Sequence, residues 1–139
     1  MPGPRFEYHP EIIETFPNVQ AGVLVGSGIV NQPSSDELKQ LYFAEQASVL
    51  EKIGKTPLSE LTSLAAWRSA FRKFGVNPTK YRSAIEALLR RLTKKGDIPS
   101  INTLVDIGNL VSIRHQIPVA VFDVTRTIGS ILVRRLFIT

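Results

Sequence analysis

The sequence contains no cysteine, and this absence excludes three kinds of chemistry. There is no disulfide framework, no thiolate metal site and no cysteine nucleophile, as is common for proteins of a reducing compartment. No apolar run approaches the roughly 18 residues of a membrane-spanning helix, and the first residues lack the apolar centre of a signal peptide. We therefore expect a cytoplasmic protein without a membrane partner.

Histidine is also scarce, with only His9 and His115 in the chain. Paired carboxylates are lacking too, so no residues have the spacing of metal ligands, and we expect no metal and no other cofactor. A G-x-G fragment at Gly26 and Gly28 lacks the third glycine and the lysine of a phosphate-binding loop, and no nucleophile elbow is present. These absences exclude the common signatures of metalloenzymes, nucleotide-binding loops and serine hydrolases.

The 139 residues, of which 43% are hydrophobic, suffice for a single domain, 1–139, that buries a core without a metal or a disulfide. The net charge of +5 is distributed unevenly: residues 1–67 carry −4, residues 68–95 carry +8, and residues 96–139 carry +1. A +8 segment of 28 residues favours a polyanionic partner, most commonly nucleic acid. The alternative interpretation is that these side chains simply solvate the outer faces of helices.

Hydrophobic periodicity and capping residues predict four main helices preceded by a short one. The short helix is expected over Glu11–Phe16, and the main helices from Ser34 or Ser35 to Ile53, from Pro57 to about Phe74, from Asn77 or Thr79 to Lys95, and over the run Asn102–Ser112. Strands are expected at Phe6–Tyr8, Val19–Val30, Val119–Val124 and Ser130–Ile138. A small-ligand pocket is expected where the last helix meets the following strand.

Two apolar stripes in the basic segment are expected to face the core. They comprise Leu64, Trp67, Phe71 and Phe74 in one helix and Tyr81, Ala84, Ile85, Leu88 and Leu92 in the next. Arg68 falls on the buried side of the first helix, where an unpaired guanidinium would be costly. Because Glu86 is the only acid in residues 68–95, we expect a cluster of Arg68, Arg82 and Glu86. Such a cluster either fixes two helices against each other or contacts a ligand.

The other cations of this segment are the candidates for contacts with nucleic-acid phosphates. They are Arg72, Lys73, Lys80, Arg82, Arg90, Arg91, Lys94 and Lys95. Several of them follow the apolar stripe of the second basic helix at positions that project outward.

Three stretches of the chain resemble a known family. Residues 100–111, S-I-N-T-L-V-D-I-G-N-L-V, and residues 117–123, I-P-V-A-V-F-D, are similar to the motifs P-I-N-N-V-V-D-x-T-N-Y-V and Q-P-L-H-A-F-D. Those motifs belong to the editing module, the B-three/B-four domain, of the phenylalanyl-tRNA synthetase beta chain. The upstream W-R-x-x-F-x-x-F-G at 67–75 resembles the free-standing relatives of that module. The resemblance covers roughly residues 5–134.

The resemblance implies an α+β, three-layer module with helices packed on a β-sheet layer, here shortened at the C-terminus. It also implies a partner, the aminoacylated end of a tRNA, from which the synthetase hydrolyses a wrongly attached amino acid. Two departures stand out: Gly108 replaces the threonine of the first motif, and Ala120 replaces the histidine of the second. Hydrolysis of an aminoacyl ester needs a positioned water and donors to the oxyanion rather than a protein nucleophile.

On this basis Asn109 and His115 are the candidate catalytic residues. The candidate substrate-binding residues are Asn102, Asp106, Gly108, Ser112 and Asp123. Structural interpretations stay open for several: Asp106 can bond neighbouring backbone, Asp123 can cap a turn, and His115 can be a surface residue at a helix end.

Three functional hypotheses follow from these residues. The first is an editing hydrolase that deacylates mischarged tRNA, and the second is a non-catalytic RNA-binding module with the same basic surface. The third is an interaction protein that forms a homo-oligomer through its apolar C-terminal strand, Ile128–Ile138, because an open strand edge invites pairing.

Overall fold

The structure is a computed structural model that describes residues 5–136, and the chain folds as two units. The larger unit is Val30–Val121, and the smaller one combines the segments on either side of it. Each unit is described by itself.

The larger unit is built on α2 (Asp36–Ile53), whose bounds follow from its caps. The hydroxyl of Ser35 accepts a hydrogen bond from the backbone N–H of Leu38 at 3.1 Å, and Gly54 ends the helix with a φ of 53°. The buried positions Tyr42, Gln46, Val49 and Ile53 recur at helical spacing. The prediction for this helix is confirmed.

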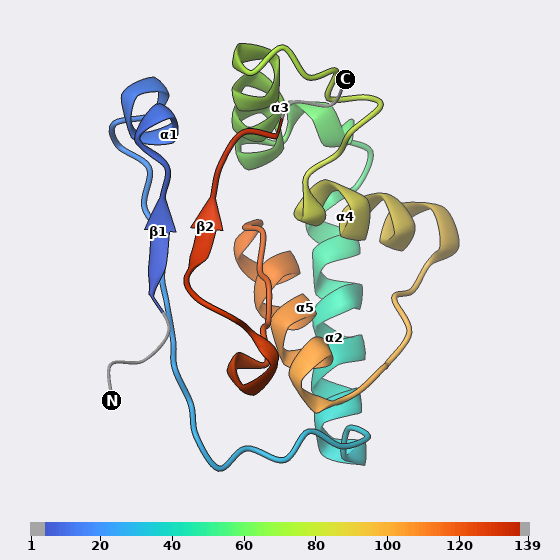
Figure 1. Ribbon diagram of the computed structural model, residues 1–139. Coiled ribbons are helices and arrows are strands. Elements are labelled where there is room, and N and C mark those ends of the chain that lie inside the picture. Colours follow the sequence, from blue (N-terminus) through green and yellow to red (C-terminus); the bar gives the residue numbers. More distant parts are fainter. Residues whose placement is uncertain (1–4, 137–139) are drawn as a thin grey trace. The chain divides into compact units, whose positions relative to one another are not determined.

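The core of the larger unit lies where α2 packs against α5 (Thr103–His115) and α4 (Ala84–Lys95) (Figure 1). Its buried side chains are Tyr42, Val49, Ile53, Leu64, Ile85, Leu89, Leu92, Ile98, Leu110 and Ile113. Gln46 is buried among them with both ends of its amide bonded to Ile98: it donates to the carbonyl of Ile98 and accepts from the N–H of Ile98, both at 2.9 Å. This pair fixes the loop before α5 to α2.

The helix predicted from Pro57 to Phe74 is broken into a short 3-10 helix, η1 (Leu58–Glu60), and α3 (Thr62–Lys73). Leu61 between them is extended, with φ −63° and ψ 131°. Leu64 is fully buried as predicted, but Trp67 is 38% exposed and packs edge-on against Phe71. Phe71 and Phe74 are half-buried, so the stripe is only partly core.

The next helix begins later than predicted. Asn77 caps a turn by accepting from the N–H of Thr79 at 2.9 Å, whereas α4 begins at Ala84 after its cap Ser83. As a result Tyr81 precedes the helix and is exposed, as is Ala84, so both were wrongly placed in the core. The buried face is Ile85, Leu89 and Leu92, with Leu88 half-buried, because these positions recur at i, i+4 and i+7.

The predicted fourth main helix is confirmed as α5. Asn102 caps it, and it ends at Gln116, whose left-handed φ of 54° turns the chain. The hydroxyl of Ser63 at the start of α3 donates to the carbonyl of Gln116, which connects the two helices. The following segment, in which a strand was predicted at Val119–Val124, has no strand. Val119 and Val121 of this segment instead lie against α5 at Gly108.

The smaller unit contains β1 (Phe6–Tyr8), α1 (Pro10–Thr15), the 3-10 helix η2 (Val124–Arg126) and β2 (Ile131–Val133). β1 and β2 pair in parallel, with Phe6 opposite Ile131 and Tyr8 opposite Val133 (Figure 1). Hydrogen bonds from the N–H of Ile131 to the carbonyl of Arg5 and from the N–H of His9 to that of Val133 extend the pairing. β1 and α1 were predicted, whereas this parallel pairing was not.

Two of the predicted strands need correction here. Val19–Val30 forms no strand: all but one of its side chains are exposed, and Leu24 is 99% exposed. Three glycines, one of them at a φ of 68° in Gly28, disfavour extended pairing, and no neighbouring strand is present in the described chain. Within Ser130–Ile138 only Ile131–Val133 is a strand, and the last two positions lie outside the described residues.

The fold is thus α+β but mostly helical, with a small two-stranded parallel sheet among the described residues. The three-layer arrangement with helices packed on a sheet stays a prediction, and so does the single domain.

Candidate nucleic-acid interface

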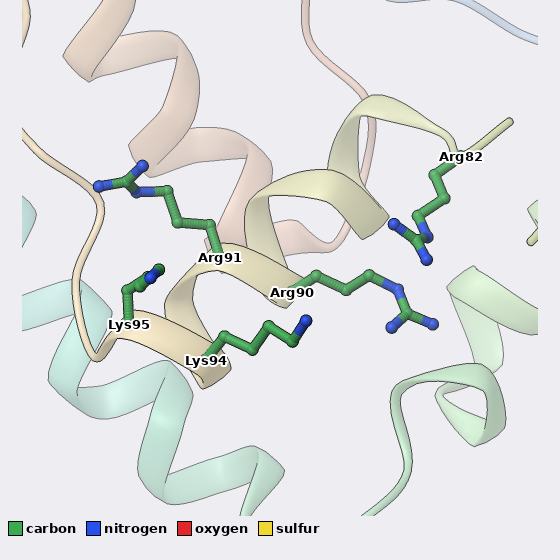
Figure 2. A pocket seen from close by; sticks show the side chains of 5 residues that line it. All are labelled: Arg82, Arg90, Arg91, Lys94 and Lys95. Atoms are coloured by element: carbon green, nitrogen blue, oxygen red, sulfur yellow. The ribbon is translucent and has the colours of Figure 1, made fainter. Parts of the chain in front are cut away.

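Five cations line a hollow of about 250 Å³ on the larger unit (Figure 2). They are Arg82, Arg90, Arg91, Lys94 and Lys95. Four of them come from the last two turns of α4, where Arg90 and Lys94, and likewise Arg91 and Lys95, are neighbours at a spacing of four residues. Arg82 joins them from the turn before the helix. All five were predicted as phosphate contacts.

The position of these cations follows from the sequence of α4. Ile85, Leu89 and Leu92 take the inward face, so the cations between and after them must project outward. The helix ends at Gly96 in the left-handed conformation, and the partial negative charge of the helix C-terminus favours Lys94 and Lys95 there. The hollow is therefore a local product of helix geometry and composition.

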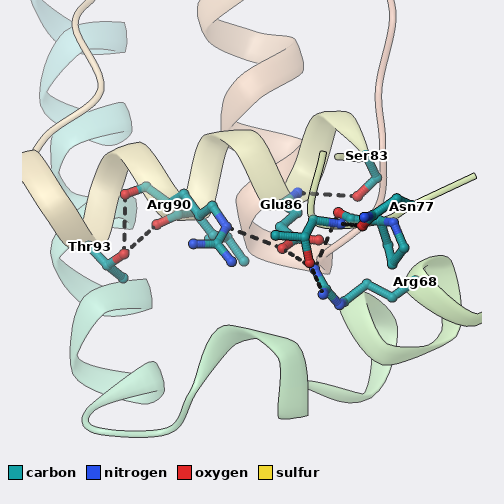
Figure 3. Close-up of polar contacts among 9 residues, drawn as sticks. Arg68, Asn77, Ser83, Glu86, Arg90 and Thr93 are labelled. Atoms are coloured by element: carbon teal, nitrogen blue, oxygen red, sulfur yellow. Dashed lines mark hydrogen bonds and ion pairs between the residues drawn. The ribbon is translucent and has the colours of Figure 1, made fainter. Parts of the chain in front are cut away.

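A buried carboxylate stands behind the hollow. Glu86 is 1% exposed, and its Oε1 accepts from Arg68 Nη1 at 2.8 Å and from Arg90 Nε at 3.2 Å (Figure 3). The predicted pair of Arg68 and Glu86 is confirmed, but the second cation is Arg90 rather than Arg82. Because α4 begins only at Ala84, Arg82 lies before the first helical turn and Arg90 holds the i+4 position.

Arg68 serves mainly as a structural clamp. Besides Glu86 it donates to the carbonyl of Pro78 at 3.4 Å and to the hydroxyl of Thr79 at 3.0 Å. Its side chain is 12% exposed, so it connects α3, the turn at 77–80 and α4 from the inside. The structure thus favours the helix-fixing interpretation of this arginine.

The other predicted phosphate contacts do not line the hollow. Arg72 and Lys73 lie exposed in the last turn of α3. Lys80 places its ammonium 5.3 Å from the ring centroid of the exposed Tyr81, a cation–π contact. They extend the positive charge of the larger unit beyond α4.

Asp106, a predicted substrate ligand, is fully buried in α5 and already satisfied. Its Oδ2 accepts from the hydroxyls of Ser34 at 2.6 Å and Ser100 at 2.5 Å, and its Oδ1 accepts from the N–H of Ile101 at 2.9 Å. Burial by itself would raise the pKa of this carboxyl, but the Ile101 N–H and the two hydroxyls outweigh it and hold the pKa below the ordinary value. The structure gives Asp106 an anchoring role.

Three further predicted substrate-binding residues also have local partners. Asn102 accepts from the N–H of Val105 at 3.0 Å as the cap of α5, and buried Ser112 donates to the carbonyl of Ile117 at 2.5 Å. Gly108 lies where a Cβ would meet side-chain atoms of Val119 and Val121 at 3.5 Å each. Gly108 therefore marks the place where the chain after α5 returns along that helix.

Asn109 is half-buried in α5 and lies next to Tyr42 of α2. The Tyr42 hydroxyl is the one buried side-chain polar atom among residues 5–136 without a hydrogen bond of normal geometry. Burial raises the pKa of this phenol, the Asn109 side chain opposes the shift, and the charge of Asp106 adds to it, so the pKa is raised overall. Tyr42 was not predicted, because in the sequence it reads as one more apolar position of α2.

His115, the other predicted catalytic residue, is exposed in the last turn of α5. It follows Asn109 by six residues, which corresponds to about 120° around the helix and about 9 Å along its axis. The helix therefore presents the two residues in different directions.

Asp123 belongs to the smaller unit and forms a local turn. Its Oδ1 accepts from the N–H and the hydroxyl of Thr125 at 3.0 and 2.7 Å, which lowers the pKa of Asp123. The structure thus favours the interpretation of Asp123 as a residue that caps a turn.

Two further features are absent from the described residues. No group of three or more histidine, aspartate or glutamate side chains in residues 5–136 could hold a metal ion. None of the helices in the same residues combines the length and the apolar character needed to cross a membrane.

Comparison with known proteins gave one match. Residues 66–137, just over half of the chain, match the family described as the B3/4 domain. The comparisons with curated proteins and with solved structures found no match. The matched segment begins within α3 and includes α4 with its cations as well as α5.

Proposed function

The chain belongs to the B3/4 domain family, and on that premise we propose that it is a tRNA-binding module that contacts phosphates through α4. The family is associated with tRNA binding and editing in the synthetase beta chain. The observation that carries the proposal is the hollow lined by five cations at the end of α4, which lies inside the matched segment. Such a surface is the electrostatic footprint of a phosphate-binding protein.

Charged side chains can also serve only to keep the outer face of a helix hydrated, but the arrangement of these cations argues for a ligand. Arg82, Arg91, Lys94 and Lys95 have no ion-pair partner in the described chain. Unpaired cations that line one hollow repel one another, which costs stability unless an anion neutralises them. A polyanion supplies that neutralisation.

Binding is expected to depend strongly on salt. Each phosphate contact releases counterions, and at about 0.15 M salt one such contact contributes roughly a fivefold gain in affinity. The double variant Arg91→Ala/Lys95→Ala should therefore bind tRNA about 25-fold more weakly and show a shallower salt dependence. The matched control is Lys52→Ala/Lys55→Ala, which removes two exposed lysines outside the hollow.

The experiment is a titration of a labelled tRNA by fluorescence anisotropy at several salt concentrations. The proposal expects the control variant to bind like the wild type and the hollow variant to bind weakly. Equal losses in both variants would show that binding depends on net charge alone. Absence of binding by the wild type at low salt would contradict tRNA binding itself.

Deacylation of mischarged tRNA is the finer function, and one observation favours it. Asn109 keeps the asparagine of the family motif and lies beside the buried Tyr42 hydroxyl, so an amide and a hydroxyl without a normal hydrogen-bond partner lie together. The half-buried amide of Asn109 is able to hold a water or to donate to a developing oxyanion, with the fully buried hydroxyl of Tyr42 beside it. This proposal assigns the reaction to Asn109. The catalytic role of His115 stays a prediction from the sequence.

The test is release of amino acid from a panel of correctly and incorrectly charged tRNAs. Release that is lost in Asn109→Ala and kept in His115→Ala would support this assignment, whereas loss in His115→Ala would restore the histidine to the site. No release on any substrate, with RNA binding intact, would identify the protein as the non-catalytic RNA-binding module.

A further inference from the structure

Arg90 differs from the other four cations of the hollow. It alone has an ion-pair partner in the described chain, through its Nε to Oε1 of Glu86 at 3.2 Å. Its two terminal nitrogens, Nη1 and Nη2, make no hydrogen bond in the same residues. The side chain is 35% exposed, so it reaches solvent although its Nε is bound to the buried carboxylate of Glu86.

Glu86 can hold Arg90 in this orientation because it is itself fixed. Its carboxylate also binds Arg68 at 2.8 Å, and its backbone N–H donates to Ser83 at the start of α4 (Figure 3). A guanidinium held at Nε loses little further conformational freedom on binding and presents a planar fork of two donors. Such a fork matches two oxygens of one phosphate group.

The side chains of the hollow divide into two groups. In Figure 2 the head group of Arg82 extends toward that of Arg90, and Lys94 extends along the same side of the helix, whereas Arg91 and Lys95 extend to the other side. One side therefore has the fixed fork of Arg90 with two further cations, and the other side has two cations without a fixed partner.

From this arrangement we propose that the hollow binds a terminal phosphate monoester, the 5′-phosphate of the bound RNA, with Arg90 as its bidentate ligand and Glu86 as the positioning residue. Arg91 and Lys95 then contact the next phosphates of the backbone. The inference rests on the proposed tRNA binding and names the part of the RNA that this site recognises.

Charge and shape both favour a terminal phosphate over an internal one. A monoester carries about −1.5 to −2 charge at pH 7 and has three free oxygens, whereas an internal diester carries one charge and has two of its oxygens bonded to the chain. Three cations around one point, with only part of one charge offset by Glu86, are better neutralised by the monoester. A free phosphate monoester shares this chemistry, so the experiment must separate the two sources.

The test uses two RNAs that differ only at the 5′ end, one with a monophosphate and one with a hydroxyl, in the form of a 5′-monophosphorylated tRNA and its phosphatase-treated copy. The wild type is expected to bind the 5′-phosphate form about tenfold more tightly at about 0.15 M salt, in line with the gain for one to two additional charge contacts. Arg90→Lys keeps the charge but loses the fork and should lower this preference to about fivefold, the gain expected from one charge contact alone. Lys95→Ala should weaken both RNAs equally and keep the preference.

Glu86→Gln tests the positioning role, with loss of the preference expected while binding of the 5′-hydroxyl RNA is retained. If Glu86→Gln fails to fold, Arg90→Lys still tests the proposal, because it leaves the pair of Arg68 and Glu86 in place. Equal binding of both RNAs by the wild type overturns the inference and leaves tRNA binding standing. Failure to bind either RNA overturns both. Competition by millimolar adenosine monophosphate without a 5′-end preference would assign the hollow to a free phosphate monoester and likewise overturn the inference.

Discussion

Replacing Asp106 by asparagine distinguishes an anchoring carboxylate from a substrate ligand. In the structure this carboxylate accepts three hydrogen bonds, from Ser34, Ser100 and the N–H of Ile101, and none of it is exposed. Ser34 precedes α2 and Ser100 precedes α5, so one side chain holds two loops and its own helix together. Asparagine has nearly the same shape but lacks the charge.

The expected cost can be derived from these contacts. A hydrogen bond to a charged group contributes about 1.5–3 kcal/mol and a neutral one about 0.5–1.5 kcal/mol, so each bond loses about 1 kcal/mol. In the variant the amide oxygen can still accept from Ile101, and the amide NH₂ can donate to hydroxyls that rotate. We therefore expect Asp106→Asn to lower the free energy of unfolding by about 2–3 kcal/mol.

The pH dependence of the free energy of unfolding tests the anchoring role of Asp106 independently. The pKa of Asp106 is lower in the folded protein than its ordinary value of 3.8, so the folded state binds the proton less tightly than the unfolded state. The stabilisation is thus present above about pH 4 and is lost as the pH falls through the lowered folded pKa. The variant should lack this component, and its unfolding free energy should change less between pH 5 and pH 3.

The assay is equilibrium unfolding in urea, followed by circular dichroism, at pH 7 and at several acidic values. The matched control is Asp97→Asn, which removes a charge from an exposed aspartate in the turn before α5 and should change the free energy by less than about 0.5 kcal/mol. If Asp106→Asn is as stable as the control but loses binding or deacylation, the carboxylate is a substrate ligand and the anchoring argument is wrong.

Three further predictions follow from single positions. Gly108→Ala should raise the free energy of unfolding by about 0.5–1 kcal/mol, because alanine favours the helix interior and its Cβ meets Val119 and Val121 at an ordinary 3.5 Å; a loss of stability in urea unfolding would show that the contact is tighter. Tyr42→Phe should leave stability unchanged or raise it by up to about 1 kcal/mol, since it removes a buried hydroxyl without a normal hydrogen bond, and a deacylation rate that falls in this variant at unchanged stability would place Tyr42 in the site. Homo-oligomer formation through the C-terminal strand predicts a concentration-dependent dimer in sedimentation velocity that Leu132→Lys dissociates, as Leu132 is 46% exposed on β2; a monomer at all concentrations contradicts it.

The helices of the larger unit are the part of the fold that local sequence predicts well. Ser35 and Gly54 define α2, Asn102 begins α5, and Gly96 ends α4, because a cap satisfies backbone groups within a few residues of itself. The errors at α3 and α4 have the same local origin. Leu61 and Ser83 set the true starts, and the apolar periodicity that continues upstream of them does not reveal a break.

The strands show the limit of that reasoning. Val19–Val30 and Val119–Val124 have suitable composition but no strand, whereas β1 and β2, only three residues each, pair across more than a hundred residues of chain. A strand needs a partner for its backbone N–H and carbonyl groups, and the partner is not encoded in the segment itself.

The candidate sites show the same division between what local sequence determines and what depends on tertiary packing. The sequence alone determined which cations gather on α4 and that Glu86 must serve an arginine, since charge content and helical spacing are local properties. Only the tertiary structure decided that Arg90 shares Glu86 with Arg68, that Tyr42 lies beside Asn109, and that Asp106 is occupied by Ser34 and Ser100. Most of those contacts join residues from different helices or loops, and the burial that strengthens them depends on how whole helices pack.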